Sequence, residues 1–132
     1  MAKAKKVKQL SFTMPNRAGL LSEVSAAVSG AKVNINALCA YEMGDSANFI
    51  LTTDGNARTR KALAQLGAEA KEEDVVAVEM PNKIGELQKV AKKIVDAGIN
   101  INYVYGTTGA GKSATCVLQT SDNAKAVKVI NK

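Results

Sequence analysis

Eight residues of this 132-residue chain match the pattern of a phosphate-binding loop. The stretch GTTGAGKS, from Gly106 to Ser113, fits G-x-x-x-x-G-K-[ST], in which backbone N–H groups and a lysine hold nucleotide phosphates. Such a loop lies between a strand and a helix, because the helix N-terminus faces the phosphates. Here the upstream NINYVY is typical of a strand, but the downstream ATCVLQTSDN is rich in β-branched residues and is typical of a second strand. The sequence therefore predicts a flexible hairpin tip in place of a nucleotide site.

A second candidate occurs twice, as PNRAG from Pro15 and as PNKIG from Pro81. In both, proline ends a strand, asparagine is a favourable helix N-cap, and glycine lets another group approach the backbone closely. A helix start carries free N–H groups and a partial positive charge, which suits a carboxylate. The same residues fit a purely structural role equally well, in which Asn16 and Asn82 only cap and the glycines only turn.

The motif NIN is also present twice, starting at Asn34 and at Asn100. Asparagine is depleted in strands and adds nothing to an apolar core, yet it opens strand-like segments here. Its amide can accept a hydrogen bond from an ammonium group or donate one to a carbonyl. Together with the PN loops, these amides predict a site for a zwitterion with a carboxylate end and an ammonium end.

Both candidates recur because the chain contains an internal duplication. MPNRAGLLSEVSAAVSGAKVNIN, from Met14, aligns with MPNKIGELQKVAKKIVDAGININ, from Met80, at an offset of 66 residues. Periodicity and turn residues predict the order strand, helix, strand, strand, helix in each copy, with a short hairpin between the second and third strands. Alternation places Ile35 on one face of the second strand, together with Ala37, Cys39 and Tyr41. The order predicts two ferredoxin-like βαββαβ units, an α+β fold.

The fourth strand is present in only one copy. AEAKEED, residues 68–74, supplies it to the first copy, whereas the second copy ends at Lys132 within its second helix. Exposed sheet edges are usually paired or covered. We therefore expect the second sheet to be completed by the first copy or by a second chain. The predicted organisation is a basic flexible head over 1–6, a first domain over 7–73 and a second over 74–132.

Composition narrows the classes of function. The formal net charge is +6, but four lysines lie within the first eight residues and leave only +2 for the body, so the head is expected to be a solvated tail. Without histidine, and with Cys39 and Cys116 far apart, no standard zinc site is expected, and the cysteines fit buried free thiols in a reducing compartment. No apolar run is long enough for a membrane helix and no secretory signal is apparent, so we expect a cytoplasmic protein.

The duplicated segments resemble ACT domains, the small-molecule-binding regulatory modules of amino-acid metabolism, and their arrangement resembles stand-alone tandem ACT proteins. The resemblance implies ferredoxin-like units packed side by side, with amino acids bound between units and no cofactor or metal. It differs in the missing last strand of the second copy and in two loop positions, where Arg17 and Ala18 become Lys83 and Ile84. Carried over by motif, the expected ligand-binding residues are Asn16, Arg17, Ala18, Gly19, Leu20, Asn34, Ile35, Asn36, Asn82, Lys83, Ile84, Gly85, Asn100, Ile101 and Asn102.

These observations favour a non-catalytic protein that binds an amino acid or similar metabolite. We expect it to form a homodimer or other homo-oligomer, and we expect a partner enzyme to respond to its ligand-bound state. Two alternatives stay open. A common RNA-binding module has the same element order and stacks bases on sheet aromatics, but only 4% of this chain is aromatic and only Tyr103 and Tyr105 form a plausible pair. An enzyme without histidine would need Asp, Glu, Lys, Tyr or Cys, and the carboxylates Asp74, Glu79, Glu86 and Asp96 show no convergent spacing.

Overall fold

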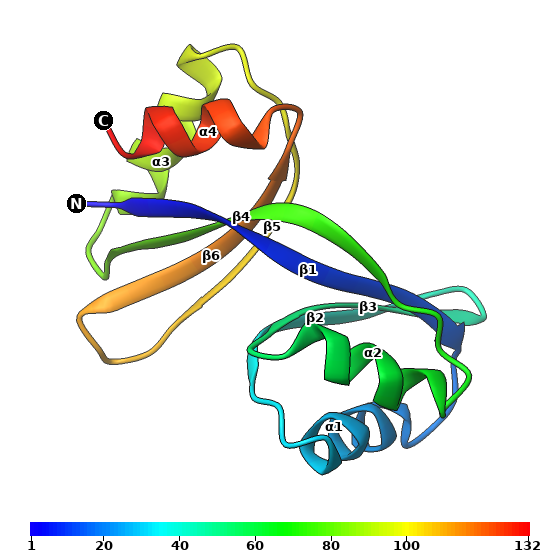
Figure 1. The fold of residues 1–132 in the computed structure, drawn as a ribbon. Coiled ribbons are helices and arrows are strands. Elements are labelled where there is room, and N and C mark those ends of the chain that lie inside the picture. Colours follow the sequence, from blue (N-terminus) through cyan, green and yellow to red (C-terminus); the bar gives the residue numbers. More distant parts are fainter. The chain divides into compact units, whose positions relative to one another are not determined.

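The computed structural model describes residues 1–132 and contains six strands and four helices. None of these helices is both long and apolar enough to cross a membrane. The elements follow in the order β1 (Lys3–Pro15), α1 (Leu20–Gly30), β2 (Ile35–Met43), β3 (Ser46–Thr53), α2 (Asn56–Ala64), β4 (Lys71–Pro81), α3 (Glu86–Asp96), β5 (Ile101–Thr108), β6 (Ser113–Thr120) and α4 (Asn123–Ile130) (Figure 1).

The chain divides into two compact units. The N-terminal unit comprises Lys8–Glu73, and the C-terminal unit comprises Asp74–Lys132 together with Met1–Val7. Strands β1 and β4 each contribute residues to both units, because the division falls within them. Each unit has the element order predicted for a ferredoxin-like fold, which confirms the predicted α+β class.

In the N-terminal unit the strand order is β2-β3-β1-β4, and β3 pairs antiparallel with both β1 and β2. Both helices pack on one face of this sheet. There the apolar face of β1 and β3 meets α1 and α2, so that a single core forms between the sheet and the helices. Its fully buried or nearly buried members include Leu10, Phe12, Val24, Val28, Phe49, Leu51 and Leu63.

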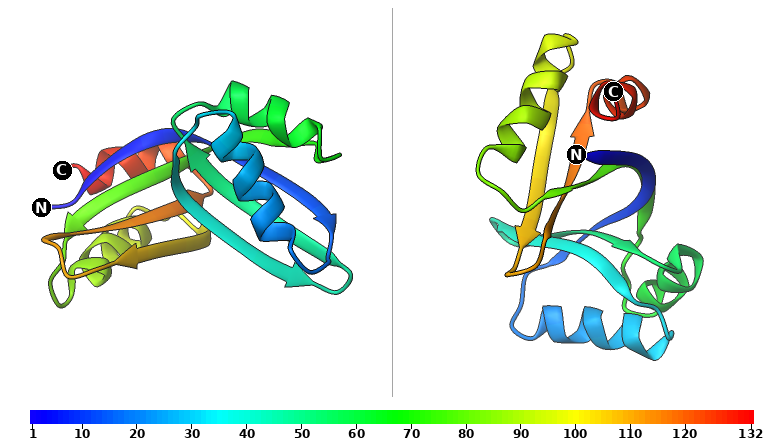
Figure 2. Two further views of the ribbon diagram at one scale, coloured as in Figure 1. Left: turned by 90° about the horizontal axis from the view of Figure 1, so that it is seen from below. Right: turned by 90° about the vertical axis from the view of Figure 1, so that its left-hand side faces the viewer.

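In the C-terminal unit the strand order is β1-β4-β6-β5, and β6 pairs antiparallel with both β4 and β5. Helices α3 and α4 pack on one face of this sheet, as Figure 2 shows. The core includes Val76, Val78, Val90, Ile94, Cys116, Leu118, Ala126 and Ile130. The two units thus repeat one architecture, as the duplicated sequence predicts.

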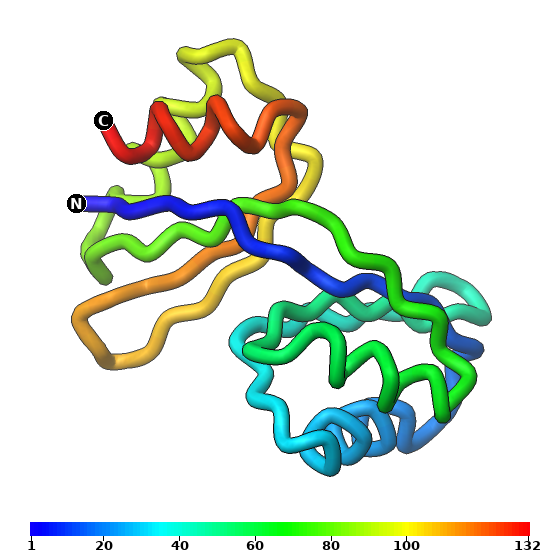
Figure 3. The backbone as a smooth tube through the Cα atoms, viewed as in Figure 1, coloured from blue at the N-terminus to red at the C-terminus, as the bar shows by residue number.

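The first residues of the chain form the fourth strand of the C-terminal unit. Ala4 is 8% exposed and belongs to the core of that unit. Its backbone N–H donates to Asn131 Oδ1 at 2.7 Å, and its carbonyl accepts from Asn131 Nδ2 at 2.8 Å. Figure 3 shows this stretch running beside β4. The prediction of a flexible head is therefore wrong for residues 3–6, which complete the sheet that the second copy leaves unfinished.

A β-bulge changes the face of the second strand in each unit. The β2–β3 register shifts directly after Ile35, which packs against the core. Beyond the shift, Leu38 lies opposite the buried Leu51, so the even-numbered residues now face the helices. The prediction that Ile35 shares a face with the odd-numbered residues after it is wrong, because the bulge inserts one extra residue. The same shift occurs in β5 between Ile101 and Tyr103.

The segment that matches a phosphate-binding loop connects two strands. β5 ends at Thr108 and β6 begins at Ser113, so the residue that would open a helix in a nucleotide site opens a strand instead. The prediction of a hairpin tip is confirmed.

Candidate functional site

The strand–helix loop of the N-terminal unit, residues 15–19, is tied to the tip of the β2–β3 hairpin. The backbone N–H of Asn16 donates to the carbonyl of Asp45 at 2.8 Å. Its side-chain Nδ2 donates to Glu42 Oε2 at 2.7 Å. Asn16 therefore does not cap the helix, and the predicted capping role is wrong.

The equivalent loop of the C-terminal unit, residues 81–85, is tied to the tip of the β5–β6 hairpin in the same way. The backbone N–H of Asn82 donates to the carbonyl of Lys112 at 2.9 Å. Its Nδ2 donates to the carbonyls of Gly109 and Gly111 at 2.9 and 3.0 Å. Asn82 does not cap its helix either, because the helix begins only at Glu86. Sequence reasoning placed the cap three residues too early.

A glycine in the left-handed conformation precedes both helices. Gly19 has φ 84° and Gly85 has φ 86°, and neither helix start has a side-chain cap. A side chain added at either glycine would meet no protein atom within 4 Å. Each helix start thus combines N–H groups that no side chain caps with open space beside the backbone, as a carboxylate-binding loop requires. In the C-terminal unit the N–H of Glu86 donates to the carbonyl of Lys83 at 3.4 Å.

The neighbouring predicted residues fall into two kinds. Leu20 is 4% exposed and its side chain belongs to the core, so only its backbone is available to a ligand. Ile84 is fully exposed, whereas Ala18, at the matching position, is a short exposed side chain. The two loops therefore present different surfaces.

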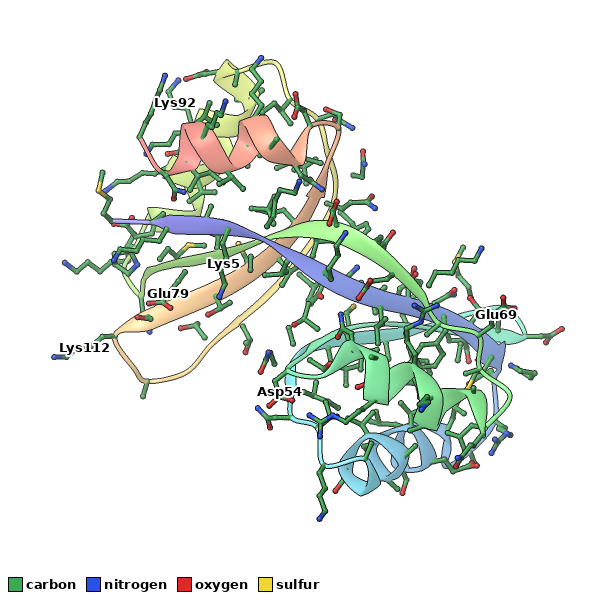
Figure 4. All side chains as sticks on the ribbon, in the orientation of Figure 1. Lys5, Asp54, Glu69, Glu79, Lys92 and Lys112 are labelled. Carbon is green, nitrogen blue, oxygen red and sulfur yellow. The ribbon has the colours of Figure 1, made fainter.

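The NIN motifs lie at the base of each hairpin, beside the end of its second strand. In the N-terminal unit, the backbone N–H of Asn34 donates to Asp54 Oδ1 at 2.9 Å, and the N–H of Asp54 donates to the carbonyl of Asn34 at 3.1 Å. Asn34 Nδ2 also donates to Asn36 Oδ1 at 3.4 Å. The amides of this motif are therefore partly used by each other. Figure 4 labels Asp54 at this end of the unit.

In the C-terminal unit the same pairing recurs with one more partner. Asn100 Nδ2 donates to Asn102 Oδ1 at 3.3 Å, and Asn102 Nδ2 donates to Gln119 Oε1 at 3.2 Å. The backbone N–H of Asn100 donates to Ser121 Oγ at 3.0 Å. Both motifs sit where the bulge occurs, which gives these asparagines a local structural role as well.

The two sets of predicted residues lie at opposite ends of one unit. The PN loop contacts the hairpin tip, whereas the NIN motif contacts the hairpin base, and the strands of the hairpin separate them. The structure therefore does not bring the two sets together within a single unit. Their meeting in a common site stays a prediction.

A groove lies beside the strand–helix loop of the C-terminal unit. Its volume is about 450 Å³, within the usual range for small-molecule sites. Asn82 and Lys83 line one end of the groove, and Leu87 of α3 lines its side. Its remaining wall comes from β4, β5 and β6, and includes Met80, Val104, Tyr105, Gly106, Thr108 and Cys116. We call this the α3–β5 groove.

Sequence reasoning missed most residues of the α3–β5 groove. Gly106 and Thr108 belong to the GTTGAGKS stretch, for which the sequence predicts only a hairpin tip, and most of the others lie on strands with no unusual motif. Burial raises the pKa of the Cys116 thiol to about 11, so this wall stays neutral at physiological pH. A second hollow, lined by Val95, Asn100 and Ile101, follows the outer side of α3. Of the predicted residues of the C-terminal unit, Asn82 and Lys83 line the groove, Asn100 and Ile101 line the second hollow, and Ile84, Gly85 and Asn102 line neither.

The loops also differ in their charges. The Arg17 guanidinium forms an ion pair with the Glu23 carboxylate in the first turn of α1. Their side-chain hydrogen bond raises the pKa of Arg17 and lowers that of Glu23. Lys83 replaces Arg17 in the C-terminal unit, and its ammonium group forms no ion pair; Lys89, in place of Glu23, pairs instead with Glu86, with 3.2 Å between Nζ and Oε1.

Fold and loops together define a duplicated ferredoxin-like protein with an uncapped, glycine-led helix start in each unit. A family model described as an ACT domain pair matches residues 5–132. The chain belongs to this family, as the duplicated motifs predict. No curated protein matches the sequence.

Solved structures resemble the fold over nearly its full length. Protein BT0572 from Bacteroides thetaiotaomicron is 29% identical, with a TM-score of 0.88 over 97% of this chain and 88% of that chain. The ligand-free regulatory subunit of aspartate kinase from Thermus thermophilus is 14% identical, with a TM-score of 0.70 over 97% and 94%. The corresponding subunit from Thermus flavus is 15% identical, with a TM-score of 0.64 over 98% and 95%. The last two similarities show the fold alone.

Proposed function

We propose that this ACT domain pair is a non-catalytic regulatory protein that binds a free amino acid or a similar small metabolite. The observation that supports it best is the helix start of each unit, where Gly19 and Gly85 leave uncapped N–H groups beside open space. Such a start binds a carboxylate through the backbone, with no charged side chain needed. The amides of the NIN motifs are the proposed hydrogen-bond partners of the ligand's ammonium group.

The proposed readout is a change in how ACT units associate. A ligand that binds one arrangement of units more tightly than another shifts the population toward it, by as much as the two affinities differ. We infer that a separate metabolic enzyme in the cytoplasm responds to this shift, and that the chain acts as a homodimer. Two of the similar structures are themselves regulatory subunits of aspartate kinase, which supports a regulatory role.

Thermal unfolding in the presence of each of the twenty amino acids tests the proposal. A ligand at one hundred times its dissociation constant adds about 2.7 kcal/mol to the free energy of unfolding, which raises the midpoint by several degrees. Substituting alanine for Gly19 and Gly85 together is expected to abolish the shift, because the added methyl groups fill the approach to the helix start.

A matched control separates ligand loss from backbone strain. Gly67 has φ 83°, close to the φ of 84° at Gly19, and it also has no protein atom within 4 Å of an added side chain. Gly67→Ala therefore imposes similar strain at the end of α2, away from either loop. It should lower the midpoint but keep the ligand-dependent shift. A panel without any shift, or a shift that survives in the Gly19→Ala, Gly85→Ala variant, would refute the proposed function.

A further inference from the structure

We propose that the two units are unequal, and that only the C-terminal unit binds a ligand, a carboxylate that carries a large apolar side chain. The α3–β5 groove holds the apolar part, and the carboxylate lies at the end of the groove beside Lys83 and Lys112. This inference deepens the proposed function by assigning the ligand to one unit and by naming its chemical class.

Core residues explain why the groove exists in this unit. In the N-terminal unit Phe12 of β1 lies opposite Phe49 of β3, and their rings stack with centroids 5.0 Å apart. In the C-terminal unit the equivalent pair is Val78 of β4 opposite Cys116 of β6. Two phenyl rings are thus replaced by two small side chains at the same place in the fold. Of these two residues, Cys116 lines the α3–β5 groove, at the position where the N-terminal unit has the ring of Phe49.

Gly106 also lines the groove, and it presents no side chain there. It lies opposite Cys116 in the β5–β6 ladder, where the N-terminal unit has Ala40 opposite Phe49. A side chain at Gly106 would lie only 2.9 Å from the carbonyl oxygen of Thr115. The missing methyl group leaves the strand backbone as the wall of the groove.

The apolar character of the groove indicates the ligand's side chain. Leu87 is 55% exposed and Val104 is 49% exposed, although both line the groove. The raised pKa of Cys116 keeps its thiol neutral, which adds to the apolar wall. An apolar group that covered these side chains would remove their surface from water, which is favourable in proportion to the area covered.

The charges around the loop indicate the ligand's other end. In the N-terminal unit, residues 15–23 and 42–46 contain Arg17, Glu23, Glu42 and Asp45, a formal charge of −2. The equivalent segments of the C-terminal unit, 81–89 and 108–113, contain Lys83, Glu86, Lys89 and Lys112, a formal charge of +2. The sign is inverted between two copies of one loop.

Particular replacements produce this inversion. Glu42 becomes Thr108, because each lies opposite the alanine at the second position of the next strand, Ala47 or Ala114. Asp45 becomes Lys112, because the carbonyl of each accepts from the asparagine of the loop. Figure 4 shows Lys112 projecting from the hairpin tip.

In the N-terminal unit the protein's own carboxylates occupy the donors of the loop. Glu42 accepts from the Asn16 amide, and Glu23 accepts from the Arg17 guanidinium. An incoming carboxylate would have to displace both and would meet the like charge of Asp45. In the C-terminal unit the ammonium groups of Lys83 and Lys112 have no ion-pair partner. Charge complementarity therefore favours an anionic ligand end at this loop only.

Titration calorimetry on the full chain tests the inference with defined probes. The probes are leucine, phenylalanine, glutamate, leucinamide, which lacks the carboxylate, and 4-methyl-2-oxopentanoate, which lacks the ammonium group. We expect leucine or phenylalanine to bind once per chain, and we expect leucinamide to bind at least tenfold more weakly. Glutamate, with a polar side chain, is expected to bind at least tenfold more weakly as well.

Variants that graft the N-terminal residues onto the C-terminal loop provide the decisive comparison. Thr108→Glu with Lys112→Asp is expected to weaken binding at least tenfold. Both positions are exposed, so the fold should survive, and circular dichroism checks it. Cys116→Phe, which restores the ring of Phe49, should fill the groove and abolish binding. The mirror variant, Glu42→Thr with Asp45→Lys, is the matched control and should leave the affinity unchanged.

The outcomes separate this inference from the proposed function. Binding of two amino acids per chain, or loss of binding in the mirror variant alone, would overturn the inference and leave the proposed function intact. Binding of 4-methyl-2-oxopentanoate without any amino acid, lost in the grafted variant, would support the groove and refute the amino-acid ligand. Equal binding of leucine and leucinamide would overturn the carboxylate assignment. Self-association abolished by the grafted variant, without ligand binding, would assign the groove to a second copy of the chain and overturn the inference.

Discussion

One left-handed residue ends the first helix of each unit, and the two copies fill this position differently. Lys32 follows α1 with φ 58°, and Gly98 follows α3 with φ 73°. In both, the next residue donates its N–H back to the last turn of the helix, from Val33 to the carbonyl of Val28 at 3.3 Å in the N-terminal unit. This geometry favours glycine, because a side chain in the left-handed region crowds its own backbone.

We expect Lys32→Gly to stabilise the protein. Relief of the left-handed lysine is worth about 1 to 2 kcal/mol, and the greater freedom of glycine in the unfolded chain offsets part of it, which leaves about 0.5 to 1 kcal/mol. Urea denaturation measures the change in midpoint. Gly98→Ala is the reciprocal control and should destabilise by a similar amount. A lower midpoint for Lys32→Gly would contradict the assignment of strain to this residue.

The sequence motifs predicted where the strand–helix loops begin and end, but they did not predict the contacts of the loop side chains. Pro15 and Gly19 mark the ends of the loop correctly, because their backbone preferences are local. The capping role given to Asn16 failed, because its side chain instead bonds Glu42, which lies in a different strand. A contact between residues 26 positions apart depends on how the hairpin folds back, and no local pattern contains it.

At the scale of elements, the fourth strand of the C-terminal unit comes from the opposite end of the chain. Residues 3–7 lie beside β4, and Asn131 bonds both backbone groups of Ala4. The lysines of this stretch gave it the appearance of a solvated tail. Alternating lysines are equally typical of an edge strand, where their charge prevents pairing with another chain. Charge pattern does not distinguish the two, so the edge could be predicted to be covered but not by which residues.

Removal of residues 1–6 is expected to destabilise the protein through the C-terminal unit. The deletion exposes the edge of β4, takes Ala4 out of the core and leaves Asn131 without its backbone partners. Hydrogen exchange should accelerate for amides of β4, β6 and α4, which lose their edge strand or its contacts. Replacement of Lys3, Lys5 and Lys6 by glutamine is the control, because it removes charge but keeps the strand. Unchanged exchange in β4 after the deletion would show that this strand is dispensable.

The bulges in β2 and β5 show where hydrophobic periodicity fails to predict which face of a strand a residue occupies. The alternation that identifies a strand also assigns faces to its residues, and one inserted residue reverses every assignment after it. Asn36 and Asn102 each lie within a bulge, and the alternation of apolar residues along the sequence did not predict either bulge. The bulge nevertheless recurs at the same place in both copies, as expected for a repeat.

At the scale of the whole molecule, comparison of the two copies is more informative than either copy alone. Shared residues identify the fold, because both copies must form the same core. Positions at which the two copies carry different residues indicate how the functions of the two units differ. The exchange of Phe12 and Phe49 for Val78 and Cys116 is visible in the sequence, but its meaning depends on the ladders that place each pair opposite one another.

Two strands pass continuously from one unit to the other, which links the stabilities of the units. β1 supplies residues 3–7 to the C-terminal unit and residues 8–15 to the N-terminal unit, and β4 is divided in the same way after Glu73. Unfolding of one unit therefore frees one end of both strands in the other. We expect the units to unfold in a single transition.

A core truncation in one unit tests this linkage. Leu51 is fully buried in the N-terminal unit, so Leu51→Ala should cost about 2 to 5 kcal/mol. If unfolding is linked, hydrogen exchange should accelerate for β6 amides of the C-terminal unit by nearly the same factor as for β3 amides. Leu21→Ala, at a side chain that is 54% exposed, is the control and should change neither. Acceleration confined to β3 would mean that the units unfold independently. Strands β1 and β4 would then connect the units without making their unfolding cooperative.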